Sequence, residues 1–462
     1  MCRGCYNGVV KPGTADDLDR PQAAASFAAL IEDRTARGIA ACINSRIRDG
    51  GLVPGDPLPT VRSLAAALGI SPTTVHAAWR LLTRSGTIDA RGRLGTFVRV
   101  DRRRTSTQRY RTVVAESGLR IDLATGVPDP DLLPDVRRAL AQVSRRTLTT
   151  TYLDQPVLPP LEELLAESWP FTPDRFTVVD GALDALDRVL GAVVRVGDRV
   201  LVEDPGFPPL FDLIEQIGGV PVGVEVDDGG MIPSALTNAL RVHPVAVVMQ
   251  PRAQNPFGSS MTAPRMAELA AIVGAGDTLV VEDDHSGDVA WAPSISMGTY
   301  LPGRTVHIRS FSKSHGPDLR LAAVGGAGPV VDEIVDRRRL GPGWSSRLLQ
   351  AVLVEMLRDP GTVATVAEAR EEYHRRRVTL SSLLADRGVV THGSDGINLW
   401  MDVEDEHTAQ VMLNVAGVGV APGAAFWLGV PATSGNLRVT LGYEGNQSDL
   451  LADALAAAAR RS

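Results

Sequence analysis

Short apolar runs that alternate with helical stretches fill the middle of the chain and most strongly limit its fold. The runs are FTVVD, RVLVED, VAVVMQ, TLVVED and TVHIRSF, spread over residues 170–330. Such runs, with helices between them, are typical of a largely parallel sheet covered by helices. Ligands of these folds bind at the carboxyl ends of the strands, so the residues that follow each run are the candidates for a site.

Polar residues and turns follow each of these runs. The first leads into GALDALDRVL, where a glycine opens a helix, and the second leads into PGFPPL. The third leads into PRAQNPFG, the fourth into Asp284 and His285, and the fifth into SKSHGPDLRL. A lysine, two carboxylates, an asparagine, a helix-opening glycine and an arginine should therefore meet at one rim of the sheet.

Lysine is almost absent from the chain, which narrows the search for amine chemistry. The 462 residues include lysine at Lys11 and Lys313 alone. Lys11 lies in a polar tail, residues 1–26, that contains Pro and Gly and is expected to be disordered. Lys313 is therefore the lysine to consider.

The residues at this rim match the needs of pyridoxal 5'-phosphate. Its aldehyde requires a lysine for a Schiff base, its ring nitrogen a carboxylate, and its phosphate a helix N-terminus, hydroxyls and an arginine. The body, residues 121–462, resembles a fold-type I aminotransferase, because SFSKSHGPDLRL is similar to the motif SFSKxxxPxLRxG and AQNPFG to NPTG. The resemblance implies an α/β fold with a large part at about 150–340 and a small C-terminal α+β part at about 370–462.

The same resemblance implies roles for individual residues. Lys313 would form the Schiff base, Asp283 would hold the ring nitrogen, and Arg438 in NLRVTLG would bind a substrate carboxylate. Asn255 would contact the ring 3-hydroxyl. The other cofactor-binding residues that it implies are Ser310, Ser312 and Arg320 at the phosphate, Gly181, Ala182 and Leu183 at the helix start, Phe207 against the ring, and His285 near the 3-hydroxyl.

Two departures from the aminotransferase pattern bear on activity. His285 stands where the family commonly has Tyr, and imidazole titrates near neutral pH. The phosphate loop reads DGALDAL instead of SGxQQAL, so Asp180 and Leu183 replace helpful donors with a like charge and an apolar group. Cofactor binding through backbone amides and Arg320 is still expected, whereas efficient transamination is less secure.

Residues 27–100 predict a winged helix-turn-helix domain. A helix is expected over Phe27–Arg48, and TVRSLAAALG forms a second helix that closes at Gly69. SPTTVHAAWRLLTRSG forms a third, with Ser71 as N-cap and Pro72 at its first position. The runs TIDA and GTFVRV then form a hairpin, so the order is that of a helix-turn-helix followed by a β-wing.

The head is basic although the whole chain carries a net charge of -7. From Phe27 to Val113 there are 15 arginines against 6 acidic residues, a net of +9, and residues 1–26 balance at 3 against 3. Residues 114–462 therefore carry -16. A basic domain suits an anionic partner, most often nucleic acid, although a solvated basic face is the alternative.

The head resembles the GntR family, whose pattern GxLxPGxxLPxxRxLAxxLGxSxxTVxxAxxxLxxxGxIxxxxxxGTFV it matches from Gly51 to Val98. The resemblance implies contacts with double-stranded DNA by Arg62, Ser71, Thr73, Thr74, His76 and Gly95. Pro72 stands where many members have Arg, so phosphate contacts should supply more of the affinity than base contacts. Residues 101–120 form an arginine-containing linker that either extends this surface or is simply solvated.

Several classes of protein are excluded by composition. No apolar run approaches the ~20 residues that a membrane-spanning helix needs. The N-terminus lacks the apolar core of a secretory signal, so a cytoplasmic location is expected. Cys2, Cys5 and Cys42 cannot supply a disulfide framework, and no cluster of residues has metal-ligand spacing.

A GntR head joined to an aminotransferase-like body is the arrangement of the MocR-type regulators, which the chain resembles. This predicts a transcription regulator that binds pyridoxal phosphate, senses a small amino compound and forms a homodimer. The alternatives are an active aminotransferase with an attached winged-helix domain, and a body that has lost the cofactor and serves only for dimerisation.

Overall fold

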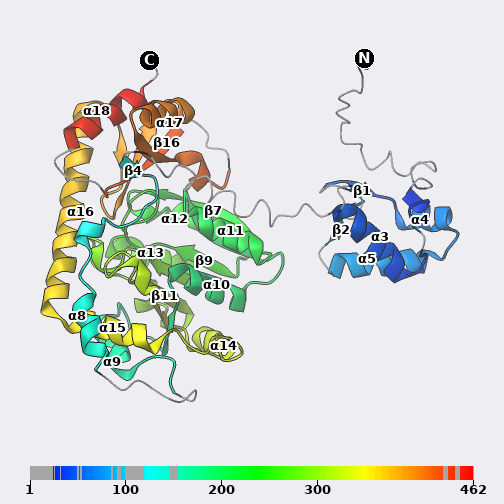
Figure 1. The fold of residues 1–462 in the computed structure, drawn as a ribbon, viewed down its shortest axis with the longest axis horizontal. Coiled ribbons are helices and arrows are strands. Elements are labelled where there is room, and N and C mark those ends of the chain that lie inside the picture. The colour runs from blue at the N-terminus through cyan, green and yellow to red at the C-terminus, as the bar shows by residue number, and fades with distance from the viewer. Residues whose placement is uncertain are drawn as a thin grey trace. The chain divides into compact units, whose positions relative to one another are not determined.

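The computed structural model describes residues 24, 27–31, 33–48, 51–52, 55–84, 87–90, 95–98, 119, 121–145, 154–429, 435–442 and 448–460. The chain divides into two compact units, Met1–Thr105 and Ser106–Ser462, here called the head and the body (Figure 1). Most of the expected tail and linker, with Lys11, Cys2 and Cys5, lies outside the described residues. No helix of the described ranges is long and apolar enough to cross a membrane.

The described residues of the head include the helices of the predicted helix-turn-helix and a small antiparallel sheet. The helices are α3 (Ala36–Arg48), α4 (Val61–Leu68) and α5 (Pro72–Arg84), and the sheet order is β1 (Pro57–Leu58), β3 (Thr96–Val98), β2 (Ile88–Ala90). Ile39, Ile43, Leu64 and Val75 are fully buried between the helices, because they recur on the faces that the helices turn toward one another. The predicted helix-turn-helix and wing are confirmed.

The expected first helix, Phe27–Arg48, was predicted too long. The backbone turns at Ala29 and Leu30, and the long helix begins only at Ala36. Asp33 Oδ1 accepts a hydrogen bond from the Thr35 amide (2.9 Å), and Thr35 Oγ1 accepts one from the Gly38 amide (3.1 Å). These side chains compete for backbone amides and thereby start a new helix instead of continuing the old one.

The ends of the helix-turn-helix agree with the sequence. Gly69 ends α4 in the left-handed conformation (φ 65°), which glycine adopts without a Cβ penalty. Pro72 occupies the first position of α5, and Ser71 Oγ accepts a hydrogen bond from the Thr73 amide (3.3 Å). Ser71 therefore caps α5 as predicted.

A mixed eight-stranded sheet forms the centre of the body. Its order is β5 (Arg175–Val179), β12 (Ala322–Gly326), β11 (Thr305–Ser310), β10 (Leu279–Asp284), β9 (Ala246–Met249), β6 (Arg199–Asp204), β7 (Val220–Asp227) and β8 (Gly230–Met231). β11, β10, β9, β6 and β7 pair in parallel, whereas β12 is antiparallel to both of its neighbours and β8 is antiparallel to β7. All five predicted runs are strands of this sheet.

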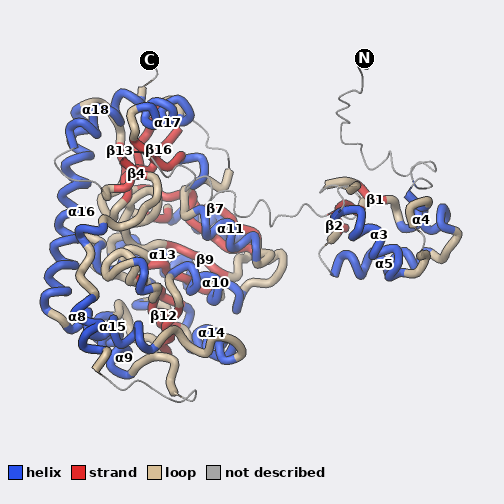
Figure 2. Tube along the Cα trace, viewed as in Figure 1, coloured by secondary structure: helices blue, strands red, loops and turns tan. Residues whose placement is uncertain are grey.

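Helices cover both faces of the large sheet (Figure 2). One face packs on α10 (Ala182–Val193), α11 (Pro208–Gln216) and α14 (Gly328–Arg339), and the other on α12 (Pro233–Ala239) and α13 (Ala263–Gly274). Near β5 and β12, the cover on that second side is α9 (Pro159–Ser168) with α15 (Arg347–Arg358). Because both faces are buried, the strands read as continuous apolar runs.

A second sheet forms the small part of the body. Its order is β13 (Thr391–His392), β14 (Asn398–Val403), β16 (Gly435–Thr440), β15 (Val418–Pro422), β4 (Ile121–Leu123). It packs on α16 (Pro360–Asp386), α17 (Glu406–Val415) and α18 (Ser448–Ala459). The long α16 runs along one side of the body and reaches both parts (Figure 1). β4 is the first described strand of the body, and it belongs to the small sheet.

Candidate cofactor site and DNA-binding surface

Asp283 is a buried carboxylate at the carboxyl end of β10. Its side chain is 2% exposed, and Oδ2 accepts a hydrogen bond from Gln250 Nε2 (2.8 Å). Oδ1 is buried and has no partner among the described residues. Burial raises the pKa of Asp283, although His285 and Gln250 oppose that rise. An orphaned buried oxygen of this kind calls for a cationic or protonated partner.

Lys313 lies in the turn after β11, where the sequence places it. Its Nζ donates a hydrogen bond to the Gly126 carbonyl (2.5 Å), from the segment that follows β4. Burial, aided by the charge of Arg438, lowers the pKa of Lys313 to about 8. An amine with this pKa is partly neutral near pH 7 and can therefore act as a nucleophile toward a carbonyl.

Arg438 and Asn255 join the small sheet to the large one. Arg438 Nη1 donates to Asn255 Oδ1 (3.2 Å), and Nη2 donates to the Ala124 carbonyl. Its guanidinium carbon lies 5.0 Å from the centre of the Phe426 ring. Burial lowers the pKa of Arg438 to about 10, so the group stays a cation at neutral pH. Its Nε is buried without a partner among the described residues, which leaves a donor for a ligand.

A backbone cradle opens α10 at the predicted phosphate end. Gly181 has φ 109° and precedes the helix, and no side chain caps that end. Arg320 reaches it from the turn after β11 and donates through Nη2 to the Asp180 carbonyl (2.9 Å). Free amides at a helix start together with an arginine form an anion site. The Asp180 carboxylate lies 3.5 Å from Arg338 Nη2, so the like charge expected there has a cationic partner.

We expect Gly181→Ala to weaken binding of pyridoxal phosphate by at least about tenfold. A Cβ at this position would lie 3.0 Å from Arg320 Nη2, and the positive φ strains any other residue. The dissociation constant, measured by titration of visible absorbance, checks this expectation. Gly303→Ala, where a Cβ meets nothing within 4 Å, is the matched control. Equal affinities of the three proteins would contradict a phosphate site at Gly181.

The remaining predicted cofactor residues lie at the ends of strands of the large sheet or at helix starts. Ser310 is buried at the end of β11, and its Oγ accepts a hydrogen bond from the Ser312 amide (3.3 Å). Ala182 begins α10, and Leu183 is 40% exposed on its first turn. Phe207 precedes α11 and packs against the core of the large sheet. The structure thus engages Phe207 in the core, and its contact with a ring stays a prediction.

His285 is held by the backbone of the turn after β9. Its Nε2 lies 2.9 Å from the Ala253 carbonyl, so this nitrogen carries the proton and donates. Burial lowers the pKa of His285, although the charge of Asp283 opposes it, and the neutral imidazole is favoured. Nδ1, 3.5 Å from Ser286 Oγ, is then the acceptor. His285 thereby joins the end of β10, which carries Asp283, to the turn that carries Asn255.

Residues that the sequence analysis did not single out complete the site. Gly126 and Ala124 supply the carbonyls that Lys313 and Arg438 bind, across 187 and 314 residues of sequence. Nothing local in the chain signals such contacts. Gln250 could have been predicted as a site residue, because it ends the run VAVVMQ at the predicted rim. It contacts both Asp283 and Asn255. Glu203 is the next-to-last residue of the run RVLVED and is equally buried.

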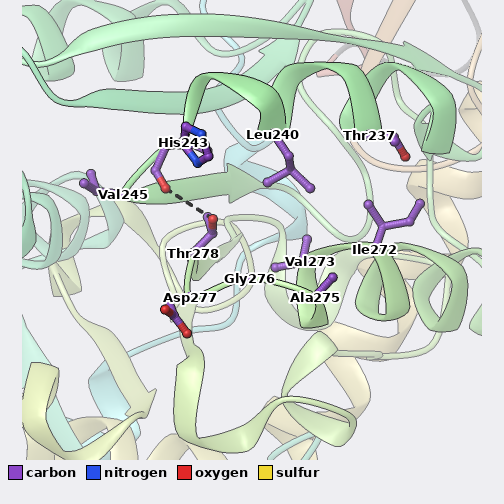
Figure 3. Close-up of a pocket in the computed structure, with 11 residues that line it drawn as sticks. Thr237, Leu240, His243, Val245, Ile272, Val273, Ala275, Gly276, Asp277 and Thr278 are labelled. Atoms are coloured by element: carbon purple, nitrogen blue, oxygen red, sulfur yellow. Dashed lines mark hydrogen bonds between the residues drawn. The ribbon is translucent and has the colours of Figure 1, made fainter.

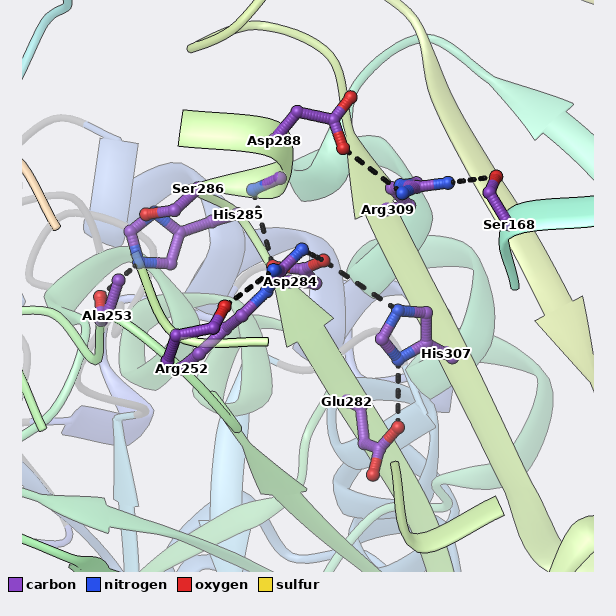
Figure 4. Close-up of polar contacts among 12 residues, drawn as sticks. Ser168, Arg252, Ala253, Glu282, Asp284, His285, Ser286, Asp288, His307 and Arg309 are labelled. Carbon is purple, nitrogen blue, oxygen red and sulfur yellow. Dashed lines mark hydrogen bonds and ion pairs between the residues drawn. The ribbon is translucent and has the colours of Figure 1, made fainter. Parts of the chain in front are cut away.

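A network of buried charges lies beneath this rim (Figure 4). Arg252 pairs with Asp284 through two hydrogen bonds of 3.0 and 2.7 Å. His307 Nδ1 lies 2.8 Å from Glu282 Oε2, and His307 Nε2 lies 3.9 Å from Asp284 Oδ2. Glu282 and Asp284 flank Asp283 along β10, so their side chains lie on the opposite face of the sheet from that of Asp283. Their role is to hold the ends of β9, β10 and β11 together.

A cavity of about 680 Å³ lies at the end of the large sheet opposite the predicted rim (Figure 3). It is lined by Leu240, His243, Val245, Ile272 and Thr278, among others. Val245 and Thr278 immediately precede β9 and β10, so the cavity is at the amino ends of the strands. It is therefore separate from the rim that carries Lys313.

The described residues include no group of three His, Cys, Asp or Glu arranged to hold a metal ion.

The head presents an exposed polar face at the start of α4 and along α5. Arg62, Ser71, Thr73 and His76 are exposed, whereas Thr74 is half-buried. Arg80, not singled out from the sequence, is exposed one turn beyond His76 on the same face of α5. Gly95 has φ 104° at the start of β3. The face offers hydroxyls, an imidazole and arginines, which suit phosphate oxygens and base edges.

We expect Arg62→Ala and Arg80→Ala each to weaken duplex binding. The loss of one arginine that contacts phosphate should reduce the slope of log K against log salt concentration by about 1. Fluorescence anisotropy over a series of salt concentrations measures this slope. Arg137→Ala, which removes an exposed arginine of the body, is the control. An unchanged slope in both head variants would show that this face does not contact DNA.

Family models agree with the two units. Residues 120–455 match the family "Aminotransferase class I and II", and residues 35–98 match "Bacterial regulatory proteins, gntR family". Among solved structures, LysN, the α-aminoadipate aminotransferase of Thermus thermophilus, superimposes with a TM-score of 0.68 at 21% identity. That match covers 76% of this chain and 94% of LysN. The body thus has the fold-type I aminotransferase architecture, joined to a GntR helix-turn-helix.

Relatives that share both units define the family of this chain more closely. The vitamin B6 salvage pathway transcriptional repressor PtsJ of Salmonella typhimurium is 34% identical over 426 residues, which are 89% of this chain and 95% of PtsJ. The pyridoxine biosynthesis regulator PdxR of Corynebacterium glutamicum is 26% identical over 74% of this chain and 77% of PdxR. The chain belongs to the GntR-type transcription regulators with an aminotransferase class I and II domain, as the MocR-type arrangement predicted.

Proposed function

We propose that this regulator binds pyridoxal phosphate in the body and that the bound state of the body sets how the head engages double-stranded DNA. The observation that carries the proposal is the pairing of two prepared groups at one rim. Lys313 is a lysine of lowered pKa, and Asp283 has a buried oxygen without a partner among the described residues. An isolated winged helix would need neither group.

Each part of the cofactor has a fitting residue. Lys313 would bind the aldehyde carbon, Asp283 Oδ1 the ring nitrogen, and the cradle of Gly181, Ala182 and Arg320 the phosphate. Ser310, Ser312 and Leu183 would border the phosphate, while Asn255, His285 and Phe207 would surround the ring. When bound, pyridoxal phosphate supplies an electron sink for amine chemistry. Arg438 would hold the carboxylate of a small amino compound.

Pyridoxal phosphate is itself a signal suited to this site. PtsJ and PdxR carry names that refer to vitamin B6 salvage and to pyridoxine biosynthesis. Their similarity supports a role in which this chain reports the supply of vitamin B6, and an amino compound at Arg438 is the second ligand. A ligand changes DNA binding only if it binds one arrangement of the regulator more tightly than another.

The segment from Ala124 to Gly126 is suited to relay that binding. Its carbonyls accept hydrogen bonds from Arg438 and Lys313, the two residues that a carboxylate and an aldehyde would engage. Ligand binding therefore competes with both contacts. The segment follows β4, which the linker sequence joins to the head. We propose that release of these carbonyls alters the start of the body and, through it, the placement of the heads in a homodimer.

The test combines cofactor and DNA measurements on the full chain. A duplex is first selected from a random pool, and its affinity is measured without ligand, with pyridoxal phosphate, and with added amino acids or keto acids. The proposal predicts saturable, sequence-specific binding whose affinity changes with pyridoxal phosphate. No specific binding at moderate salt would overturn it. Reversible conversion of the cofactor to its pyridoxamine form would instead favour an active aminotransferase.

A further inference from the structure

Glu203 is a second buried carboxyl beside the one that faces the ring nitrogen. It is the next-to-last residue of β6, is 4% exposed, and its Oε2 accepts a hydrogen bond from the Gln250 backbone amide (3.1 Å). The Gln250 side chain donates to Asp283 Oδ2 (2.8 Å). One glutamine therefore joins the two carboxyls, from the end of the strand that lies between β6 and β10.

Two joined carboxyls in a buried site cannot both ionise at low cost. Burial raises the pKa of Glu203 to about 8, and the negative charge of Asp283 adds to the rise. Asp283 is the charged group that acts on Glu203 from β10. The residues that contact Glu203 from the turn after β9 are Gln250 and Gln254, and both are neutral. A hydrogen bond from the Gln250 side chain favours the ionised form of Asp283, so Glu203 is the carboxyl that we expect to keep the proton.

Building on the proposed cofactor site, we propose that Glu203 is a positioning residue for it. In its neutral form it anchors the Gln250 amide, and Gln250 in turn holds Asp283 Oδ2 and leaves Oδ1 free for the ring nitrogen. Gln250 Oε1 also accepts a hydrogen bond from the Asn255 amide (2.8 Å). The same anchor thereby orients Asn255, the predicted partner of the ring 3-hydroxyl.

Glu203→Gln separates a protonated anchor from an ionised one. Its amide has the shape and charge of the neutral acid, since one oxygen can still accept from Gln250 while the NH₂ replaces the hydroxyl. We expect affinity for pyridoxal phosphate at pH 7 within about twofold of the unaltered protein. Glu203→Ala removes the acceptor, strands the buried amide, and should lower affinity about tenfold. Equal losses in both variants, or none in Glu203→Ala, would overturn the proposal.

Infrared spectroscopy of the protein without cofactor gives an independent readout. The carbonyl stretch of a protonated carboxyl should be present at pH 7, disappear in Glu203→Gln, and disappear from the unaltered protein as the pH rises through about 8. A carboxyl with only a packing role could be ionised and would lack this band. Its absence would overturn the proposal even if pyridoxal phosphate binds. If the unaltered protein binds no pyridoxal phosphate, the cofactor site fails while this readout still tests Glu203.

Discussion

Lys313→Ala should abolish the visible absorption band that pyridoxal phosphate gives on binding and lower its affinity at least about 100-fold, or ~2.7 kcal/mol. Lys313 is the lysine at the rim, and burial with the nearby Arg438 lowers its pKa to about 8. No other described residue offers an amine there, because the chain has one further lysine, Lys11. Absorbance titration of the purified full chain measures both effects.

The matched control is Lys11→Ala, which removes the other lysine and should leave band and affinity unchanged. The pH dependence of the rate of band formation supplies a second check on Lys313. Only the neutral amine attacks the aldehyde, and its fraction grows as the pH rises toward about 8. Band formation should therefore accelerate up to that pH and level off above it. A band that survives in Lys313→Ala would refute the assignment.

Arg252→Met should lower the free energy of unfolding of the body by about 3–5 kcal/mol. The Arg252 side chain is 7% exposed and the Asp284 side chain 1%, and the two form a bidentate pair. Loss of the arginine leaves a buried carboxylate without its ion-pair partner, and the Gly287 amide still donates to Asp284 Oδ1 (3.3 Å). Urea denaturation followed by circular dichroism measures the change. Arg137→Met, in an exposed pair with Asp135, should cost less than about 1 kcal/mol.

The loss of unfolding free energy in Arg252→Met should become smaller as the pH falls. Burial alone would raise the pKa of Asp284, but the charge and hydrogen bonds of Arg252 hold it well below its usual range. The stability from this pair is therefore present above the unfolded pKa, near 4, and is lost as the pH falls below it. The difference between the two proteins should be largest near pH 7 and shrink as the pH falls. Without Arg252, burial raises the pKa of Asp284, so the variant recovers stability first, and below about pH 4 the pair of the unaltered protein is lost as well. A constant difference would show that Asp284 is not its source.

Much of the architecture could be predicted from local sequence. The five apolar runs became strands because their length and β-branched residues suit a sheet buried on both faces. Ser71, Pro72 and Gly69 set the ends of the helix-turn-helix by capping and left-handed geometry. The first helix was predicted too long because its apolar spacing continues through a break that Asp33 and Thr35 create with short-range hydrogen bonds.

The sequence by itself determined which residue types end each strand, and hence that a lysine, carboxylates and an arginine lie at one rim. Only the tertiary structure decided which carboxyl oxygens are left without partners among the described residues and which carbonyls Lys313 and Arg438 bind. Those contacts join β4 to β11 and β16 across more than 180 residues. The physical reason is that burial and distance set charge and pKa, and neither is encoded within a local window of sequence. Glu203 shows this most clearly, since burial raises its pKa to about 8 and the charge of Asp283, which the sheet brings near, adds to the rise.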